Sequence, residues 1–307
     1  MKNLFKYSIA CTLLLVAMSA YAQQKPIPEG FLPSAGSTAI GFSINPVAGI
    51  KANGIFKTGD FIGNSVAHQG SYPYQMFLLA QSPMASISVK HKFSDLLALK
   101  ASVGFSGAYF NYREYVYDDV ARFNNPLSED VVEDNIRFSM AGGGALIGME
   151  FTGGNRKLRF TGGLSLMYSF GGGSMLFKYG NAITAANQKP TCIQLISDSL
   201  NDYTSNGDIT YARPIKRYTS GVEHGIGIMC DLGIEWFFAE RLSLGANVTF
   251  APIVVAFQPQ TYIIYEGYSQ AQGATVEYNK LISPGSTTLL YGTENLGLVL
   301  SLHYYLK

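Results

Sequence analysis

Apolar side chains occupy every second position in eight separate segments of this 307-residue chain. In the segment 296–306, for example, leucines fall on even numbers, whereas Gly297, Ser301 and His303 fall on odd numbers. A period of two is typical of a β-strand whose two faces meet different surroundings. The pattern therefore predicts an all-β chain. The eight segments are 38–44, 84–93, 99–112, 136–151, 158–170, 222–238, 242–250 and 296–306.

One segment, 136–151, changes the parity of its apolar positions. Phe138 and Met140 share one face, while Ile147 and Phe151 share the other, and the run Gly142-Gly143-Gly144 lies between the two pairs. A β-bulge inserts one extra residue and is often marked by glycine. We therefore expect a glycine-rich bulge in this run.

The connections between the segments differ in length in a regular way. Three are tight, at 94–98, 153–157 and 239–241, and four are long, at 47–82, 113–135, 171–221 and 251–295. Short and long connections alternate along the chain, as in transmembrane barrels with short periplasmic turns and long outer loops. The sequence thus predicts an eight-stranded antiparallel transmembrane β-barrel over residues 36–307.

The N-terminal region indicates export. Lys2 and Lys6 precede an apolar run over 9–20, and Ala20-Tyr21-Ala22 offers small residues at the positions that a signal peptidase reads. We predict a signal peptide over 1–22, a Pro-containing periplasmic lead-in over 23–35, and a location in the cell outer membrane. Beyond residue 22, no apolar run approaches the ~18 residues of a membrane helix.

Charge and cysteine content exclude several classes of partner and site. Removal of residues 1–22 leaves 20 basic and 21 acidic residues, so nothing suggests a nucleic-acid partner. Cys230 lies on the apolar face of its segment and Cys192 lies in a polar loop, so we expect no disulfide. The four histidines lack metal-ligand spacing, and neither a metal nor another cofactor is expected.

Aromatic residues gather at both ends of the apolar faces. Two such girdles mark the lipid interfaces of an outer-membrane barrel. Four of the aromatics belong to the predicted outer rim and the others to the inner rim. The predicted girdle comprises Tyr109, Tyr168, Phe170 and Phe250 outside, and Phe93, Phe151, Trp236, Phe238 and Tyr304 inside.

Charged residues occupy the polar faces and should point into the barrel. Eight strands leave an interior only wide enough for side chains to fill, and an unpaired buried charge costs several kcal/mol. We therefore predict an internal network of ion pairs in preference to a conducting, charge-selective pore. Its expected members are Lys90, Lys92, Lys100, Arg137, Arg159, Glu223, Asp231 and Glu235.

These features together resemble the small outer-membrane β-barrel proteins of Gram-negative bacteria, of the OmpA-transmembrane and OmpX kind. The resemblance rests on the signal peptide, the alternating segments, the turn and loop pattern, and the final segment LGLVLSLHYYLK. It implies a fold but not an activity. Members commonly end in an aromatic residue, whereas this chain ends Leu306-Lys307. No periplasmic peptidoglycan-binding domain is expected.

The long connections are the expected carriers of function. The region 261–287 holds Tyr262, Tyr265, Tyr268 and Tyr278, which suit a contact surface, although strands that continue beyond the membrane as hairpins explain them equally. We expect a structural or surface-interaction role, not an enzyme. The expected state is a monomer, and the expected partners are outer-membrane lipid, lipopolysaccharide and an extracellular protein or glycan.

Two other functions remain open from the sequence. A porin-like passage for small solutes would need a wider lumen, for example from additional strands in 47–82. A lipid A-modifying hydrolase would draw on Ser220, Glu223 and His224 in the stretch TSGVEHGIG. However, adjacent strand positions face opposite ways, so Glu223 should point inward and His224 outward. An interfacial histidine explains His224 as well.

Overall fold

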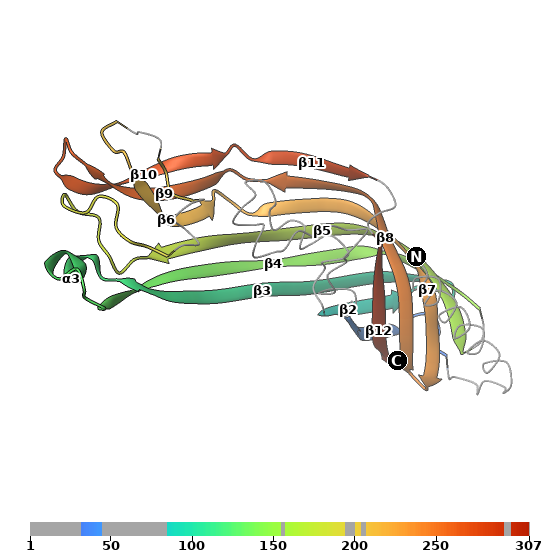
Figure 1. The fold of residues 1–307 in the computed structure, drawn as a ribbon. Coiled ribbons are helices and arrows are strands. Elements are labelled where there is room, and N and C mark those ends of the chain that lie inside the picture. The colour runs from blue at the N-terminus through green and yellow to red at the C-terminus, as the bar shows by residue number, and fades with distance from the viewer. Residues whose placement is uncertain are drawn as a thin grey trace, which may run out of the picture.

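The computed structural model describes residues 32–44, 85–154, 157–193, 200–203, 207–291 and 296–306. It is an antiparallel all-β structure with one short helix (Figure 1). The predicted signal peptide, most of the lead-in and the whole of the connection 47–82 lie outside the described residues. No helix in the described ranges is long and apolar enough to span a membrane. The elements are β1 Thr38–Ile44, β2 Ala85–Lys92, β3 Leu97–Tyr117, α3 Asp119–Asn124, β4 Val131–Gly153, β5 Leu158–Lys178, β6 Ala212–Thr219, β7 Glu223–Ala239, β8 Leu242–Gln258, β9 Thr261–Ser269, β10 Ala274–Ser283, β11 Ser286–Tyr291 and β12 Leu296–Leu306.

The described residues form a sheet of twelve strands, which is more than the eight expected. The four additional strands, β6, β9, β10 and β11, arise within the connections expected to be loops. β6 pairs with the far end of β5, β9 pairs with β6, β10 pairs with β9, and β11 pairs with the far end of β8. Strands β3, β4, β5 and β8 also run further than predicted. The tyrosine-rich segment is therefore largely a β-hairpin.

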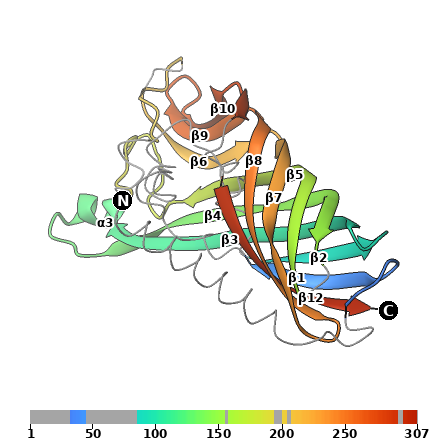
Figure 2. The same ribbon diagram turned by 90° about the vertical axis from the view of Figure 1, so that its right-hand side faces the viewer.

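Eight of the strands form a closed circuit of pairings. β1 pairs with both β2 and β12, and the circuit continues through β3, β4, β5, β7 and β8 before it returns through β12 (Figure 2). Because the circuit closes, its strands satisfy one another's backbone groups without a free edge at this level. These eight strands are those that the alternating segments predicted. We call this circuit the ring.

The expected bulge at Gly142–Gly144 is absent. β4 keeps one register with β3 and with β5 through these glycines. The register instead shifts between β7 and β8, where Ile228 faces Ile253 and Cys230 faces Phe250. Pro252 lies in that interval, and a residue without a backbone N–H is tolerated in a sheet at such an irregularity.

The parity change in β4 has another cause, which is a change of surroundings along an unbroken strand. Near the short turns the outer face is apolar: Ile147 is 54% exposed and Phe151 is 60% exposed. Beyond the glycines the inner face becomes apolar, with Met140 buried and Ile136 packed into a core. β5 behaves in the same way, because Leu164 and Leu166 are exposed whereas Phe177 is buried.

The core at the far end belongs to the strands that extend beyond the ring. Its members come from β5, β6, β9 and the segment that connects β5 to β6. They cover the inner faces of β4 and β5 in the way that two layers of a water-soluble fold cover each other. The buried members are Phe177, Ile193, Leu200, Ile209, Ala212, Ile263 and Tyr265.

Candidate functional site

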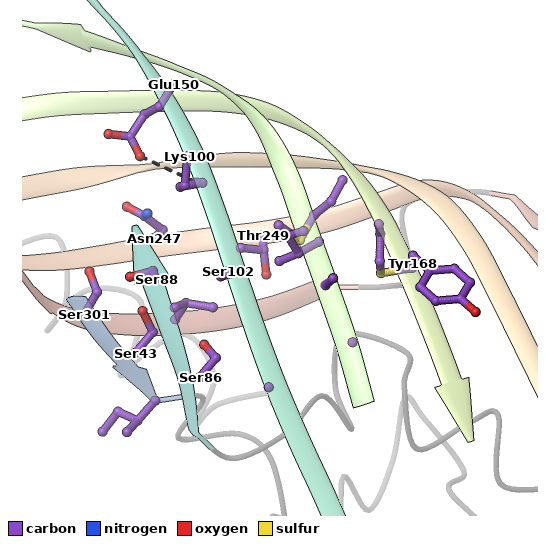
Figure 3. A pocket seen from close by; sticks show the side chains of 18 of the residues that line it. Ser43, Ser86, Ser88, Lys100, Ser102, Glu150, Tyr168, Asn247, Thr249 and Ser301 are labelled. Carbon is purple, nitrogen blue, oxygen red and sulfur yellow. Dashed lines mark ion pairs between the residues drawn. The ribbon is translucent and has the colours of Figure 1, made fainter. Parts of the chain in front are cut away.

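The interior of the ring holds a cluster of charged side chains from five strands. We call the set the interior charge cluster. Each member occupies a position on the polar face of its strand, which the ring turns inward. Figure 3 shows two of them, Lys100 and Glu150, beside a chamber lined by hydroxyl groups. The members are Lys90 on β2, Lys100 on β3, Glu150 on β4, Asp231 and Glu235 on β7, and His303 on β12.

The cluster is a continuous chain of alternating charges. Lys100 Nζ lies 2.8 Å from Asp231 Oδ1 and 3.5 Å from Glu150 Oε2. Lys90 Nζ lies 2.6 Å from Glu150 Oε1 and 3.3 Å from Glu235 Oε2. Each lysine thus lies between two carboxylates, and Glu150 lies between the two lysines. Such mutual pairing offsets the cost of removing these ions from water.

Glu235 has additional partners at the end of the chain. Its Oε1 accepts hydrogen bonds from Ser243 Oγ at 2.7 Å and from Tyr305 Oη at 2.9 Å. His303 Nδ1 lies 3.5 Å from the same oxygen. A buried carboxylate with several donors is stabilised in its ionised form. Glu235 therefore ties β7 to β2, β8 and β12 at once.

The structure brings together four of the eight predicted network residues: Lys90, Lys100, Asp231 and Glu235. Lys92 instead donates to the backbone oxygens of Pro33 and Asp95, at 3.5 and 3.3 Å.

The other three predicted members lie apart from the chain of ion pairs. Arg159 is buried beside the cluster, with its guanidinium carbon 5.7 Å from the centre of the Phe237 ring. Arg137 lies on β4 beyond the glycine run, and Glu223 is buried at the opposite end of β7 from Glu235.

Sequence reasoning missed Glu150, His303 and Tyr305. All three lie on the polar faces of predicted segments. Glu150 alternates with Met149 and Phe151, so the period of two already placed it inward. His303 and Tyr305 also occupy polar-face positions, but neither is counted as formally charged, so the charge pattern alone did not indicate them.

Two apolar layers and a small chamber fill the rest of the interior. Met167, Met229, Ala251 and Val254 pack together on one side of the chamber, and Ala39, Phe237 and Tyr305 pack together nearer the short turns. The chamber between the strands has a volume of about 120 Å³, which is room for a few water molecules. Its polar lining includes Ser43, Ser86, Ser88, Ser102, Asn247, Thr249 and Ser301 (Figure 3).

The predicted girdle residues all have side chains that are at least partly exposed on the outside of the ring. Phe170, Trp236 and Phe250 are half-buried, and Trp236 lies 5.9 Å from Phe238, between ring centres. The more exposed members are Phe93, Tyr109, Phe151, Tyr168, Phe238 and Tyr304. An outward band of this kind places aromatic rings where a lipid interface would require them.

Two residues of the hydrolase hypothesis, Glu223 and His224, lie on opposite faces of β7. Glu223 is buried and points inward. His224 Nδ1 lies 2.8 Å from Tyr168 Oη, and the two rings stack on the outside of the sheet. His224 thus has a structural partner in Tyr168. Cys192 and Cys230 are both free, so the expectation of no disulfide between them is confirmed.

Comparison with known proteins gives weak matches. No family model matches the chain, and no curated protein matches it significantly. Among solved structures, a major outer membrane protein from Thermus thermophilus shares 11% identity, covering 89% of this chain and 100% of that chain, with a TM-score of 0.33. The outer membrane protein OprG from Pseudomonas aeruginosa shares 10% identity over 88% of this chain and 98% of that chain, with a TM-score of 0.27.

Proposed function

We propose that the ring is an eight-stranded transmembrane barrel of the outer membrane, which presents a folded structure on the cell surface. We call this structure the surface platform; it consists of the far ends of β3, β4, β5 and β8, the strands β6, β9, β10 and β11, and the described residues between β5 and β6. The observation that carries this proposal is the reversal of the apolar face within the unbroken strands β4 and β5. At one end of these strands the outer face is apolar, which suits lipid outside the ring. At the other end the inner face is apolar and packs into a core, which suits water outside. The same sheet therefore meets two different solvents.

The outer face of the ring supports lipid as one of these solvents. Its exposed apolar side chains come from every strand of the ring, and soluble monomers rarely expose contiguous apolar patches above a few hundred Å². The closed pairing also leaves no unsatisfied strand edge at this level, as hydrocarbon surroundings require. The exposed side chains include Phe42, Ile87, Val103, Ile147, Leu164, Leu232, Val248 and Leu302.

The interior favours a structural or surface-interaction role over a porin-like passage. The chain of ion pairs crosses the lumen from β7 through β3, β4 and β2, and the apolar layers close the space on either side. The additional strands extend the far end of the sheet and leave the circuit of pairings at eight. A solute would have to break several buried ion pairs to pass, so we infer that the lumen is closed.

Buried polar contacts fix the surface platform. Asp134 accepts hydrogen bonds from the backbone N–H groups of Gly180 and Ile193, at 2.8 and 2.9 Å. Arg213 pairs with Glu266 at 2.7 Å, and Lys280 pairs with Asp202 at 2.7 Å. A rigid scaffold that presents surface segments is a common arrangement for binding. We infer that the platform contacts an extracellular protein or glycan and performs no catalysis.

Epitope insertion tests the membrane assignment and the topology together. A tag between Gln272 and Gly273, in the β9–β10 turn, should be detected on intact cells. The matched tag between Glu240 and Arg241, in a short turn of the ring, should be detected only after the outer membrane is permeabilised. Both proteins should require detergent for extraction and should migrate anomalously on gels until boiled. Recovery in the soluble periplasm, or the opposite pattern of tag exposure, would refute the proposal.

A further inference from the structure

The far tip of the β3–β4 hairpin carries three apolar side chains that are largely exposed. α3 lies at this tip, at the end of the molecule away from the short turns (Figure 1). Val120 is 69% exposed, Phe123 is 85% exposed and Leu127 is 88% exposed. Val120 and Phe123 lie side by side because residues three apart share a helix face, and Leu127 follows just after the helix. We call these three residues the apolar tip.

The backbone beneath the apolar tip is held by its own polar contacts. Asp118 Oδ1 accepts hydrogen bonds from the N–H groups of Val120 and Ala121, at 2.8 and 3.1 Å. The Arg122 guanidinium lies 3.2 Å from the centre of the Tyr117 ring. The N–H of Leu127 donates to Asn125 Oδ1 at 3.2 Å. These contacts position the backbone that carries the apolar tip.

Contacts with a neighbouring segment fix the helix to the platform. Asp119 N–H donates to Asn181 Oδ1 at 3.0 Å, and Asp119 Oδ2 accepts from Asn187 Nδ2 and from the N–H of Thr191, both at 2.7 Å. A surface ordered before binding loses little conformational entropy when a partner docks. The polar groups around the apolar tip hold its backbone in place, but no described residue covers its three apolar side chains.

The surroundings of the apolar tip are strongly acidic. Residues 113–133 contain six carboxylates and two arginines, which gives a net charge of −4. Glu129, Asp130 and Glu133 follow Leu127 closely in the sequence and are exposed. This negative charge opposes docking on anionic lipid, and it opposes docking on a second copy of the same acidic tip, because in each case two negatively charged surfaces would repel each other. It favours a partner that carries positive charge around an apolar recess.

We propose that the apolar tip is a docking surface for a protein partner whose binding face has an apolar cleft rimmed by lysine or arginine side chains. Phe123 supplies the central anchor, and Val120 and Leu127 widen the apolar contact. The carboxylates around them meet the basic rim of the cleft. This inference rests on the proposed function and deepens it, because it names the part of the surface platform that binds and the chemistry of its partner.

The test uses the full-length protein in nanodiscs of zwitterionic phosphatidylcholine, which expose both ends of the barrel and so do not depend on its topology in cells. The probe is a covalently linked pair of 18-residue amphipathic helical peptides whose leucine faces form an apolar groove flanked by lysines. A second peptide has glutamate in place of each lysine. Binding is measured on the wild type, on V120S/F123S/L127S, on Glu129→Lys, and on Leu289→Ser, which removes an exposed apolar side chain from β11 as a control.

The wild type and Leu289→Ser should bind the leucine–lysine peptide with equal affinity. The triple variant and empty nanodiscs should each bind it at least tenfold more weakly. Glu129→Lys and 0.5 M salt should each weaken binding, and the leucine–glutamate peptide should bind at least tenfold more weakly. Equal binding to wild type and triple variant, or no binding to either, would overturn the inference. Wild-type binding to anionic vesicles that depends on the apolar tip would also overturn it, in favour of a membrane partner. The epitope experiment tests the proposed function separately.

Discussion

Glu150 is the residue on which the interior charge cluster depends most directly. It contacts Lys90 and Lys100 at 2.6 and 3.5 Å and is nearly inaccessible to solvent. Without its charge, two buried ammonium groups would share the two remaining carboxylates. Loss of one partner from a buried ion pair commonly costs more than the pair itself contributes, because the remaining ion stays desolvated.

We therefore expect Glu150→Gln to lower the free energy of unfolding by about 3–5 kcal/mol. The measurement is the urea midpoint at which the unboiled, fast-migrating band disappears from gels. Glu129→Gln is the matched control, because Glu129 is exposed at the far tip, and it should leave the midpoint unchanged. An unchanged midpoint for Glu150→Gln would contradict the role given to the cluster.

A second residue, Cys192, should reveal the packing of the platform through its titration. Burial raises the pKa of the Cys192 thiol above its ordinary value near 9.0. The reactive thiolate is therefore scarcer in the folded protein than in the unfolded chain at the same pH.

In a Cys230→Ala background, iodoacetamide should modify Cys192 more slowly in the folded protein than in urea at pH 8. Because the folded pKa is the higher one, the thiol's contribution to stability is fully present below pH 9 and is lost as the pH rises through the folded pKa. Modification at the same rate in both states would show that this part of the platform is open.

At the scale of single elements, β4 shows how glycine permits close approach inside a sheet. A Cβ atom built at Gly148 would overlap the carbonyl oxygen of Leu164 and the Cα of Ser165 on β5. At Gly172, on β5 itself, a Cβ would meet no atom within 4 Å. The two positions differ in available space although both are glycines within paired strands.

Gly148→Ala should thus destabilise the ring by at least about 1–3 kcal/mol, because backbone atoms cannot yield as a flexible side chain would. Gly172→Ala should leave stability nearly unchanged. Both variants can be compared by the same urea midpoint. A similar midpoint for the two variants would argue against the register of β4 with β5.

At the scale of the whole molecule, whether ions can cross the proposed barrel depends on the space inside the ring. In the proposed barrel the ion pairs lie across the lumen, and eight strands leave little space beyond their own side chains, from which we infer that the lumen is closed. The additional strands lengthen the wall of the molecule on one side rather than widen the ring.

Planar-bilayer recordings of the purified wild type should accordingly show no large, stable single-channel steps. A sixteen-stranded porin in the same lipid provides the conducting control, because its lumen is an aqueous channel. Steady conductance from the wild type would restore the porin-like alternative and would mean that the interior charge cluster opens in the membrane.

The sequence by itself determined the strands of the ring and the orientation of their side chains. Alternation is local, since each residue's face follows from its neighbours in the strand, and all eight segments became strands of the ring. The inward placement of Lys90, Lys100, Asp231 and Glu235 followed from the same parity. The three short turns were also readable, because a tight connection leaves little choice of geometry.

Only the tertiary structure decided the partners and the surroundings. The ion pairs join β2, β3, β4 and β7, and their match in height depends on the stagger between strands, which no local pattern encodes. β6 and β11 become strands because the far ends of β5 and β8 offer them backbone partners, and β9 and β10 follow because β9 pairs with β6 and β10 pairs with β9. The parity change in β4 resembled a bulge because alternation shows only which face of a strand is apolar. Whether that face contacts lipid or packs against a protein core is decided by the three-dimensional fold.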